Sequence, residues 1–173
     1  MIRRAILVAI IVALGAVGSF YLYSAFKPPQ TGTREFVSAG IPSAATEAIV
    51  EYVHDGDTLF LTDGRKVRLL GINTPEIGDD RECYGDEATA LLRALLPEGT
   101  RVWVLGDIEP LDQYGRSLLF IYTDDASNIN LELLERGAAE VEQYPPNMLL
   151  QSELESAEDA ARAAGVGLWA ACR

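Results

Sequence analysis

The sequence is poor in the residues that several common enzyme classes need. Its 173 residues include one His and two Cys. A single His argues against a zinc site built from several histidines and against a Ser-His-Asp hydrolase, and two Cys are too few for a four-thiolate metal site. Basic residues are also scarce: 14 Lys and Arg stand against 26 Asp and Glu, a formal charge of -12. This balance argues against a protein that coats nucleic acid with a broad basic surface.

The longest uncharged stretch is residues 5–26, which follows Arg3 and Arg4. A helix rises about 1.5 Å per residue, so this stretch can span a hydrocarbon core of roughly 30 Å. We therefore predict a transmembrane anchor whose amino end stays cytoplasmic. The alternative is a cleaved signal peptide with its cleavage site near residues 16–18. Both interpretations place the rest of the chain outside the cytoplasm, either membrane-anchored or secreted.

Residues 27–46 are rich in Pro, Gly, Ser, Thr and Ala without sustained periodicity, and we predict a linker there. Residues 47–173 are predicted to be one domain. Its hydrophobic patterning predicts strands at residues 48–54, 58–62, 66–72, 101–105 and 117–122, and helices at 86–96, 130–136 and 149–164. Five strands with a helix inserted after the third predict a mainly β fold with α elements (α+β): a small closed barrel with about three packed helices.

Polar residues concentrate where these strands begin and end. The segment Asp55-Gly-Asp57-Thr58 opens the second strand, and Asn73-Thr-Pro-Glu76 follows the third, which contains Arg68. The segment at residues 112–116 leads into the fifth strand. If the strands are neighbours in a barrel, oxygen ligands and two guanidinium groups converge on one rim.

Such a combination suits phosphodiester chemistry. A hard cation prefers oxygen ligands, which Asp57, Asn73, the carbonyl of Thr74 and Glu76 can offer. Two arginines can bind a phosphodiester while a carboxylate activates water. Each motif alone is weak evidence, because Asp-Gly-Asp usually forms a turn and an interior Arg usually makes a structural ion pair.

Taken together, the motifs resemble the staphylococcal nuclease (thermonuclease) family. The resemblance rests on four stretches in the family's order, and it covers residues 47–172. The stretches are His54-Asp-Gly-Asp-Thr58, Arg68-Leu-Leu-Gly-Ile-Asn-Thr-Pro-Glu76, Tyr84-Gly-Asp-Glu-Ala88 and Asp112-Gln-Tyr-Gly-Arg116. Gly137, the Tyr144-Pro-Pro-Asn147 segment and the closing Gly165 to Trp169 also match.

The resemblance implies a five-stranded OB-type barrel that hydrolyses DNA and RNA with Ca²⁺ and leaves 3'-phosphate ends. By matching position, Asp57 would be a calcium ligand and Thr74 would ligate through its carbonyl. Glu76 would act on the attacking water. Arg68 and Arg116 would bind the scissile phosphate and stabilise its transition state.

Three further positions follow from the same resemblance. Tyr114 would order the loop that presents an arginine, and Tyr144 would stack on a base or touch a phosphate. Asn73 departs from the family, which has Asp as a second carboxylate ligand there. An amide oxygen ligates Ca²⁺ without supplying charge, so we expect weaker calcium binding. A changed metal preference and lost activity remain the alternatives.

The predicted domain is more acidic than the whole chain: from Glu47 onward it has 25 Asp and Glu against 10 Lys and Arg. A domain of this charge gathers polyanions slowly. Two other functions therefore remain open beside an active monomeric nuclease that uses DNA and RNA as substrates. One is an inactive binding module of the same fold, and the other is an envelope protein that holds calcium.

Cys83 and Cys172 are an even pair in a segment inferred to be exported, which predicts a disulfide. It would close a loop of about 90 residues and stabilise the fold by about 2–4 kcal/mol on the chain-entropy account. Two free buried thiols are the alternative.

Overall fold

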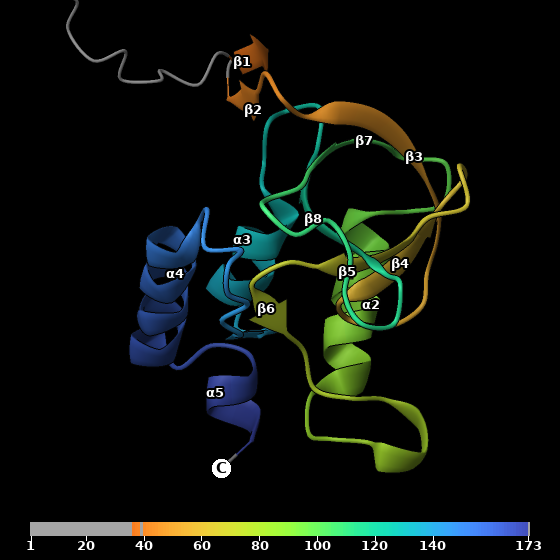
Figure 1. Ribbon diagram of the computed structural model, residues 1–173. Helices are drawn as coiled ribbons and strands as arrows, with labels where there is room; N and C mark the ends of the chain where they lie inside the picture. The colour runs from red at the N-terminus through yellow and green to blue at the C-terminus, as the bar shows by residue number, and fades with distance from the viewer. Residues whose placement is uncertain (1–35, 39, 173) are drawn as a thin grey trace, which may run out of the picture. The chain divides into compact units, whose positions relative to one another are not determined.

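The computed structural model describes residues 36–38 and 40–172, and residues 35–173 form one compact unit (Figure 1). The predicted transmembrane segment, residues 5–26, lies outside the described residues. Among the residues that are described, no helix is long and apolar enough to cross a membrane.

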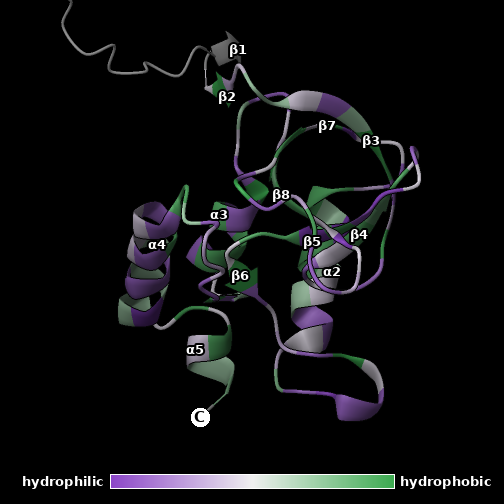
Figure 2. Cartoon of the chain, viewed as in Figure 1, coloured by the Kyte–Doolittle hydropathy of each residue, from purple (hydrophilic) through white to green (hydrophobic). Residues whose placement is uncertain are grey.

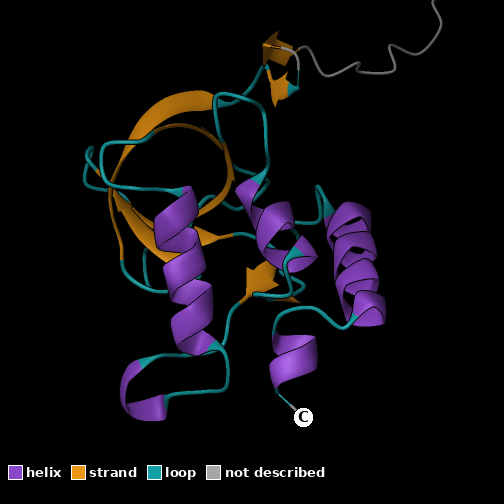
Figure 3. Ribbon diagram, turned by 180° about the vertical axis from the view of Figure 1, so that it is seen from behind, coloured by secondary structure: helices purple, strands orange, loops and turns teal. Residues whose placement is uncertain are grey.

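Five strands form a closed barrel, as predicted (Figures 1 and 3). Around the barrel their order is β3 (Thr46–Val53), β4 (Thr58–Leu61), β5 (Lys66–Leu69), β8 (Ser117–Tyr122) and β7 (Arg101–Leu105). Four neighbouring pairs are antiparallel, and β5 pairs with β8 in parallel. The parallel pair follows from the long connection between these strands, which contains α2 (Gly85–Leu95) and all of β7.

Turn chemistry and side-chain pairing fix the register of the first three strands of the barrel. Between β4 and β5, Gly64 has φ +89° and donates its N–H to Leu61 O at 2.9 Å. Only glycine adopts this conformation without strain. Between β3 and β4 the rings of Tyr52 and Phe60 stack with their centroids 4.6 Å apart. The turn at Gly64 and the stacked rings thus hold neighbouring strands of the barrel in register.

The helices lie on the outside of the barrel, and the three longest confirm those predicted from the apolar spacing. They are α2, α3 (Ile129–Glu135) and α4 (Gln151–Ala164). Asn128 caps α3 by accepting a hydrogen bond from the N–H of Leu131, and Gly165 ends α4 in the left-handed conformation. α4 packs against α3 and is largely hydrophilic on its remaining surface (Figure 2). Two short elements were not predicted: the 3-10 helix η1 (Gly78–Asp80) and α5 (Leu168–Ala171).

The hydrophobic core fills the barrel and continues beneath the helices. Its largest fully buried side chains come from the strands and from α2 and α3. Among them are Leu59, Leu69, Leu92, Phe120 and Ile129.

The predicted strand at residues 66–72 is too long, because β5 ends at Leu69. Gly71 has φ +80°, and a Cβ there would lie 2.4 Å from Leu154 Cδ1. The chain therefore turns at Gly71, and β6 (Ile72–Asn73) pairs with β9 (Glu140–Val141) in a separate two-stranded sheet. This sheet rests on a long-range pairing that local patterning does not reveal.

The linker prediction for residues 27–46 falls partly outside the described residues. Within the described part, β1 (Phe36–Ser38) pairs with β2 (Ile41–Pro42), and Ile41 is buried. Ordered structure therefore begins before Glu47.

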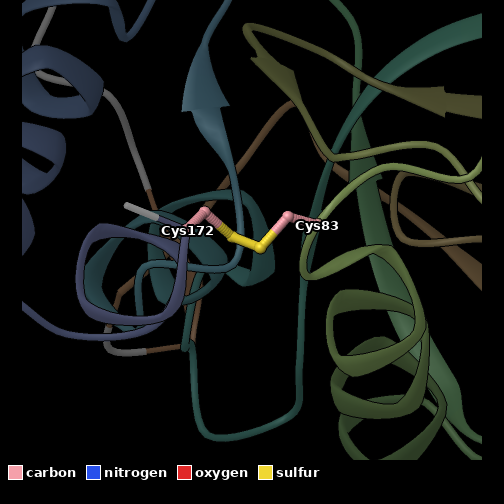
Figure 4. Close-up of a disulfide and its surroundings, with 2 residues drawn as sticks. All are labelled: Cys83 and Cys172. Carbon is pink, nitrogen blue, oxygen red and sulfur yellow. A yellow bond between two sulfur atoms is a disulfide. The ribbon is translucent and has the colours of Figure 1, made fainter.

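Cys83 and Cys172 form the predicted disulfide (Figure 4). Their Cα atoms are 5.8 Å apart, within the ordinary range for this bond. The bond joins the segment just before α2 to the residue that follows α5. The carboxy terminus is thereby held beside the loop that begins at Asn73.

Candidate active site

One cleft of about 400 Å³ collects nearly all of the predicted site residues. Its lining includes Asp57, Arg68, Asn73 and Glu76 from the barrel rim and the loop after β6. It also includes Tyr114 and Arg116 from the loop before β8, and Tyr144 from the segment after β9. Thr74 is buried just behind them. Segments far apart in the sequence therefore converge, as the spacing of the motifs had indicated.

Asp57 is the best-held carboxylate of the cleft. It is 6% exposed, and its Oδ2 accepts hydrogen bonds from the N–H and the Oγ1 of Thr74 at 3.0 and 3.1 Å. Its Oδ1 accepts from Thr58 Oγ1 at 3.1 Å. The preceding Gly56 is required by close packing, because a Cβ there would lie 2.5 Å from Thr74 Oγ1. The turn before β4 and the loop after β6 are thus locked together.

Asp55 shapes the same turn and adds negative charge beside Asp57. Its Oδ1 accepts from the backbone N–H groups of Asp57 and Thr58 at 3.1 and 2.7 Å. Burial, and then the negative charge of Asp57, raise the pKa of Asp55. A bound cation would relieve this repulsion.

Arg68 lies inside β5 and is itself buried. Its Nη1 donates to the backbone oxygens of Leu69 and Ile72 at 2.9 and 2.6 Å. Its Nη2 donates to Asn73 Oδ1 and to Glu142 Oε2, both at 2.9 Å. Because the guanidinium is fixed from several sides, its charge is presented to the cleft in one orientation.

Glu76 lies in the loop after β6, where the residue as a whole is exposed. Partial burial of its carboxyl group, and then the negative charges of Asp57 and Asp55, raise the pKa of Glu76. Its backbone is pinned to a second acidic residue, Glu82. The N–H of Glu76 donates to Glu82 Oε2 at 3.0 Å, and its carbonyl accepts from the N–H of Glu82 at 2.9 Å. Gly85 leaves room for this loop, since a Cβ there would lie 2.3 Å from Glu76 O.

Arg116 is positioned by Asp112, whose side chain is fully buried. Asp112 Oδ2 accepts from Arg116 Nε at 2.6 Å, and Oδ1 accepts from the N–H groups of Tyr114 and Arg116 at 2.9 Å each. Burial acts to raise the pKa of Asp112, but the hydrogen bonds and charge of Arg116 outweigh it and lower the pKa. Among the described residues, none accepts a hydrogen bond from the Nη1 or Nη2 of Arg116. These two groups remain available to a ligand.

The two predicted tyrosines are placed differently. Tyr114 is 76% exposed, and the Arg116 guanidinium carbon lies 5.6 Å from its ring centroid. Tyr144 is half-buried at the cleft edge, where its carbonyl accepts from the N–H of Asn147 at 2.8 Å. Asn147 in turn exchanges two hydrogen bonds with the backbone of Glu109. The segment with Tyr144 is therefore tied to the loop that leads to Arg116.

The ligand types in the cleft suit a hard cation, although the ligands together supply little negative charge. Carboxylates, an amide and a carbonyl are the ligands that Ca²⁺ prefers. Burial, and then the negative charges of neighbouring carboxylates, raise the pKa values of Asp55 and Glu76. Within the part of the chain that the structure describes, however, no three His, Cys, Asp or Glu side chains form a ready-made metal cluster. Asn73 can contribute an oxygen ligand to such a site, but it contributes no charge.

The sequence profile of the Staphylococcal nuclease homologue family matches residues 66–171. The chain belongs to this family. The thermonuclease of Staphylococcus intermedius is 33% identical over 127 residues, which are 70% of this chain and 74% of that protein. An uncharacterized endonuclease of Escherichia coli O157:H7 is 36% identical over 124 residues, which are 68% of this chain and 72% of that one. Endonuclease YhcR of Bacillus subtilis is 33% identical over 105 residues, only 9% of its own length.

Two charged residues of the cleft, Lys66 and Glu142, were missed by sequence reasoning. Glu142 follows β9 and lines the cleft opposite Arg68. The alternation Glu140-Val141-Glu142 is the only local signal for it, and such a pattern is common on solvated surfaces. Glu142 lies in this nuclease-family cleft because β6 pairs with β9, and no local sequence pattern predicts that pairing.

Proposed function

We propose that this protein is a calcium-dependent phosphodiesterase that hydrolyses DNA and RNA to products with 3'-phosphate ends. The observation that carries the proposal is the convergence of two arginines with the acidic groups Asp57 and Glu76 in one cleft. Membership of the staphylococcal nuclease family supports the same conclusion, as do the thermonuclease and endonuclease among its relatives.

Each residue has a distinct part in the proposed reaction. Arg68 and Arg116 bind the scissile phosphate and stabilise the charge that grows on its oxygens. Glu76 accepts a proton from the attacking water on its carboxylate, and its raised pKa makes it a better base than an ordinary glutamate. The bond between phosphorus and the 5'-oxygen then breaks, and the phosphate stays attached to the 3'-oxygen.

Calcium would be held by Asp57, the Asn73 amide oxygen and the Thr74 carbonyl, and it would neutralise phosphate charge as the water attacks. Among these groups only Asp57 supplies a negative charge. We therefore propose that half-maximal activity needs more calcium than a site with two carboxylate ligands would need.

The proposed site of action lies outside the cytoplasm, with the protein membrane-anchored or secreted as a monomer. Two observations support the location. One is the uncharged stretch at residues 5–26 behind two arginines. The other is the disulfide, since such bonds persist in oxidising compartments.

The test uses the compact unit, residues 35–173, in its oxidised form. Plasmid DNA, single-stranded DNA and RNA are incubated across a calcium series at low salt, with a chelator control. We expect cleavage that requires calcium, and end labelling with and without phosphatase treatment should identify 3'-phosphates. Folded, oxidised protein that cuts nothing at millimolar calcium would refute the proposal.

A second candidate is a binding module of the same fold without catalysis. Asn73 favours it, because the metal site lacks one carboxylate of the family pattern. This candidate predicts nucleic-acid binding without calcium-dependent cleavage. The substitution Asn73→Asp separates the two: if activity appears only in that variant, the natural chain is the binding module.

A further inference from the structure

All five N–H groups of Arg68 already have partners within the protein. A guanidinium has five donors and no acceptor. Nη1 donates to the backbone oxygens of Leu69 and Ile72, Nη2 donates to Asn73 Oδ1 and Glu142 Oε2, and Nε forms an ion pair with Asp57 Oδ1 at 3.3 Å. A phosphate that binds Arg68 must therefore take the place of one of these acceptors.

Glu142 is the acceptor that an anion can most readily replace. Of the five, it alone is both charged and exposed: its side chain is 45% exposed, against 9% for that of Asp57. Asn73 is exposed but neutral. The backbone of Glu142 is fixed, because its N–H donates to Gly71 O at 3.0 Å. Among the described residues, Arg68 is the only hydrogen-bond or ion-pair partner of the Glu142 side chain.

We propose that the Glu142 carboxylate occupies the phosphate position on Arg68 and that a substrate phosphate binds by displacing it into solvent. This inference rests on the proposed nuclease function. A carboxylate and a phosphate oxygen make the same charge-assisted bond with a guanidinium. Glu142 is thus a specificity-determining residue that lowers affinity for every phosphate, and polymers with several phosphate contacts overcome it best.

The two arginines of the cleft then engage the substrate in order. No described residue accepts a hydrogen bond from the Nη groups of Arg116, whereas both Nη groups of Arg68 donate to partners within the protein. An incoming phosphate meets Arg116 first and reaches Arg68 only as Glu142 leaves. The ion pair thereby holds Arg68 in its binding orientation until the substrate arrives.

Binding is tested on the full-length protein in detergent, with EDTA and at low salt, so that no turnover occurs. The probe is a fluorescein-labelled single-stranded oligothymidylate, followed by anisotropy. We expect Glu142→Gln and Glu142→Ala to lower its Kd about three- to fivefold, as for release of a partly exposed ion pair. The matched control is Glu135→Gln, which removes the same charge from an exposed position on α3 outside the cleft.

An unchanged Kd in both Glu142 variants would overturn the proposal. An equal gain in Glu135→Gln would also overturn it, because the cause would then be bulk charge. The binding arm needs no hydrolysis, so its result stands even if the wild-type protein proves inactive and the proposed function fails.

Kinetics and calcium titration separate this role from two others. With calcium and an oligonucleotide substrate, KM should fall by the same factor in Glu142→Gln while kcat stays unchanged. Calorimetric titration with calcium alone should give the wild-type affinity. Weaker calcium binding would make Glu142 a metal ligand and contradict the proposal. A lower melting temperature with a lower kcat and a higher KM would assign it a structural role instead.

Discussion

Glu76 and Glu82 are bonded to each other in both directions: the N–H of Glu76 donates to the Glu82 carboxylate, and the N–H of Glu82 donates to the Glu76 carbonyl. The next residue is Cys83, which is joined to Cys172 near the carboxy terminus. The loop that carries the proposed general base is therefore anchored within one residue of the disulfide. Covalent closure and catalytic geometry are coupled in this segment.

This coupling predicts that reduction lowers both stability and turnover. Replacing both cysteines by serine should destabilise the domain by about 2–4 kcal/mol, since the bond spans 89 residues. It should also reduce kcat, because the Glu76 loop loses its anchor. Denaturant unfolding and steady-state rates, measured well below the melting temperature, check this prediction. Addition of reductant should reproduce both effects in the wild type and neither in the double-serine protein.

Removal of the reacting groups should abolish turnover without unfolding the domain. We expect Arg116→Ala and Glu76→Gln each to lower kcat/KM by at least about 100-fold. The control is Arg136→Ala, on α3, whose guanidinium pairs only with Glu132 among the described side chains. Circular dichroism melting should place Glu76→Gln and Arg136→Ala near the wild type and Arg116→Ala below it but still folded, because the buried Asp112 loses its ion-pair partner. Full activity in either cleft variant would disprove its assigned role.

Restoring a carboxylate at position 73 should strengthen calcium binding. In Asn73→Asp the calcium concentration for half-maximal rate should fall by about tenfold, because a second charged ligand joins Asp57. The same carboxylate would still accept from Arg68 Nη2, as the amide oxygen does now. Calorimetric titration checks the affinity independently of rate. An unchanged calcium requirement would show that this position does not limit metal binding.

As pH is lowered, kcat/KM should begin to fall at a higher pH than it would if the general base were a glutamate with an ordinary pKa. Burial is the largest cause of the raised pKa of Glu76 and persists when calcium offsets the charge of the neighbouring aspartates, so the proton-accepting form is lost as pH falls through a raised value. The measurement is kcat/KM against pH at saturating calcium. Glu76→Gln should abolish this acid limb in whatever activity remains, whereas a limb at the same pH in that variant would assign it to another group.

Asp112 should stabilise the fold at neutral pH and lose this contribution in acid. Its pKa is lowered in the folded state because the hydrogen bonds from Arg116 outweigh burial. The stabilisation is therefore complete above the unfolded pKa of about 3.9 and disappears as pH falls through the folded value. We expect Asp112→Asn to cost about 2 kcal/mol at pH 7 and much less near pH 2, as measured by urea unfolding. An equal cost at both pH values would contradict this account.

The barrel itself could be predicted from the sequence because its signals are local. Alternating apolar residues and the turn at Gly64 defined β3, β4 and β5 within a few residues. The site was also foreseeable, because its motifs stand at strand ends that a barrel brings together. By contrast, the break at Gly71 arises from contact with Leu154, and the position of Glu142 arises from pairing of β6 with β9. Both depend on segments far apart in the sequence, which local patterns do not connect.

The small β6–β9 sheet separates the scaffold of this protein from the part that can vary. Asn73 and Glu142 belong to this sheet or adjoin it, while the barrel strands hold the core. On the proposed function, exchanges at these two exposed positions would alter metal and phosphate affinity without disturbing buried packing, because surface changes of this kind usually cost little stability. Natural variation can therefore adjust calcium demand and substrate affinity to a habitat in single steps, with the same barrel retained beneath.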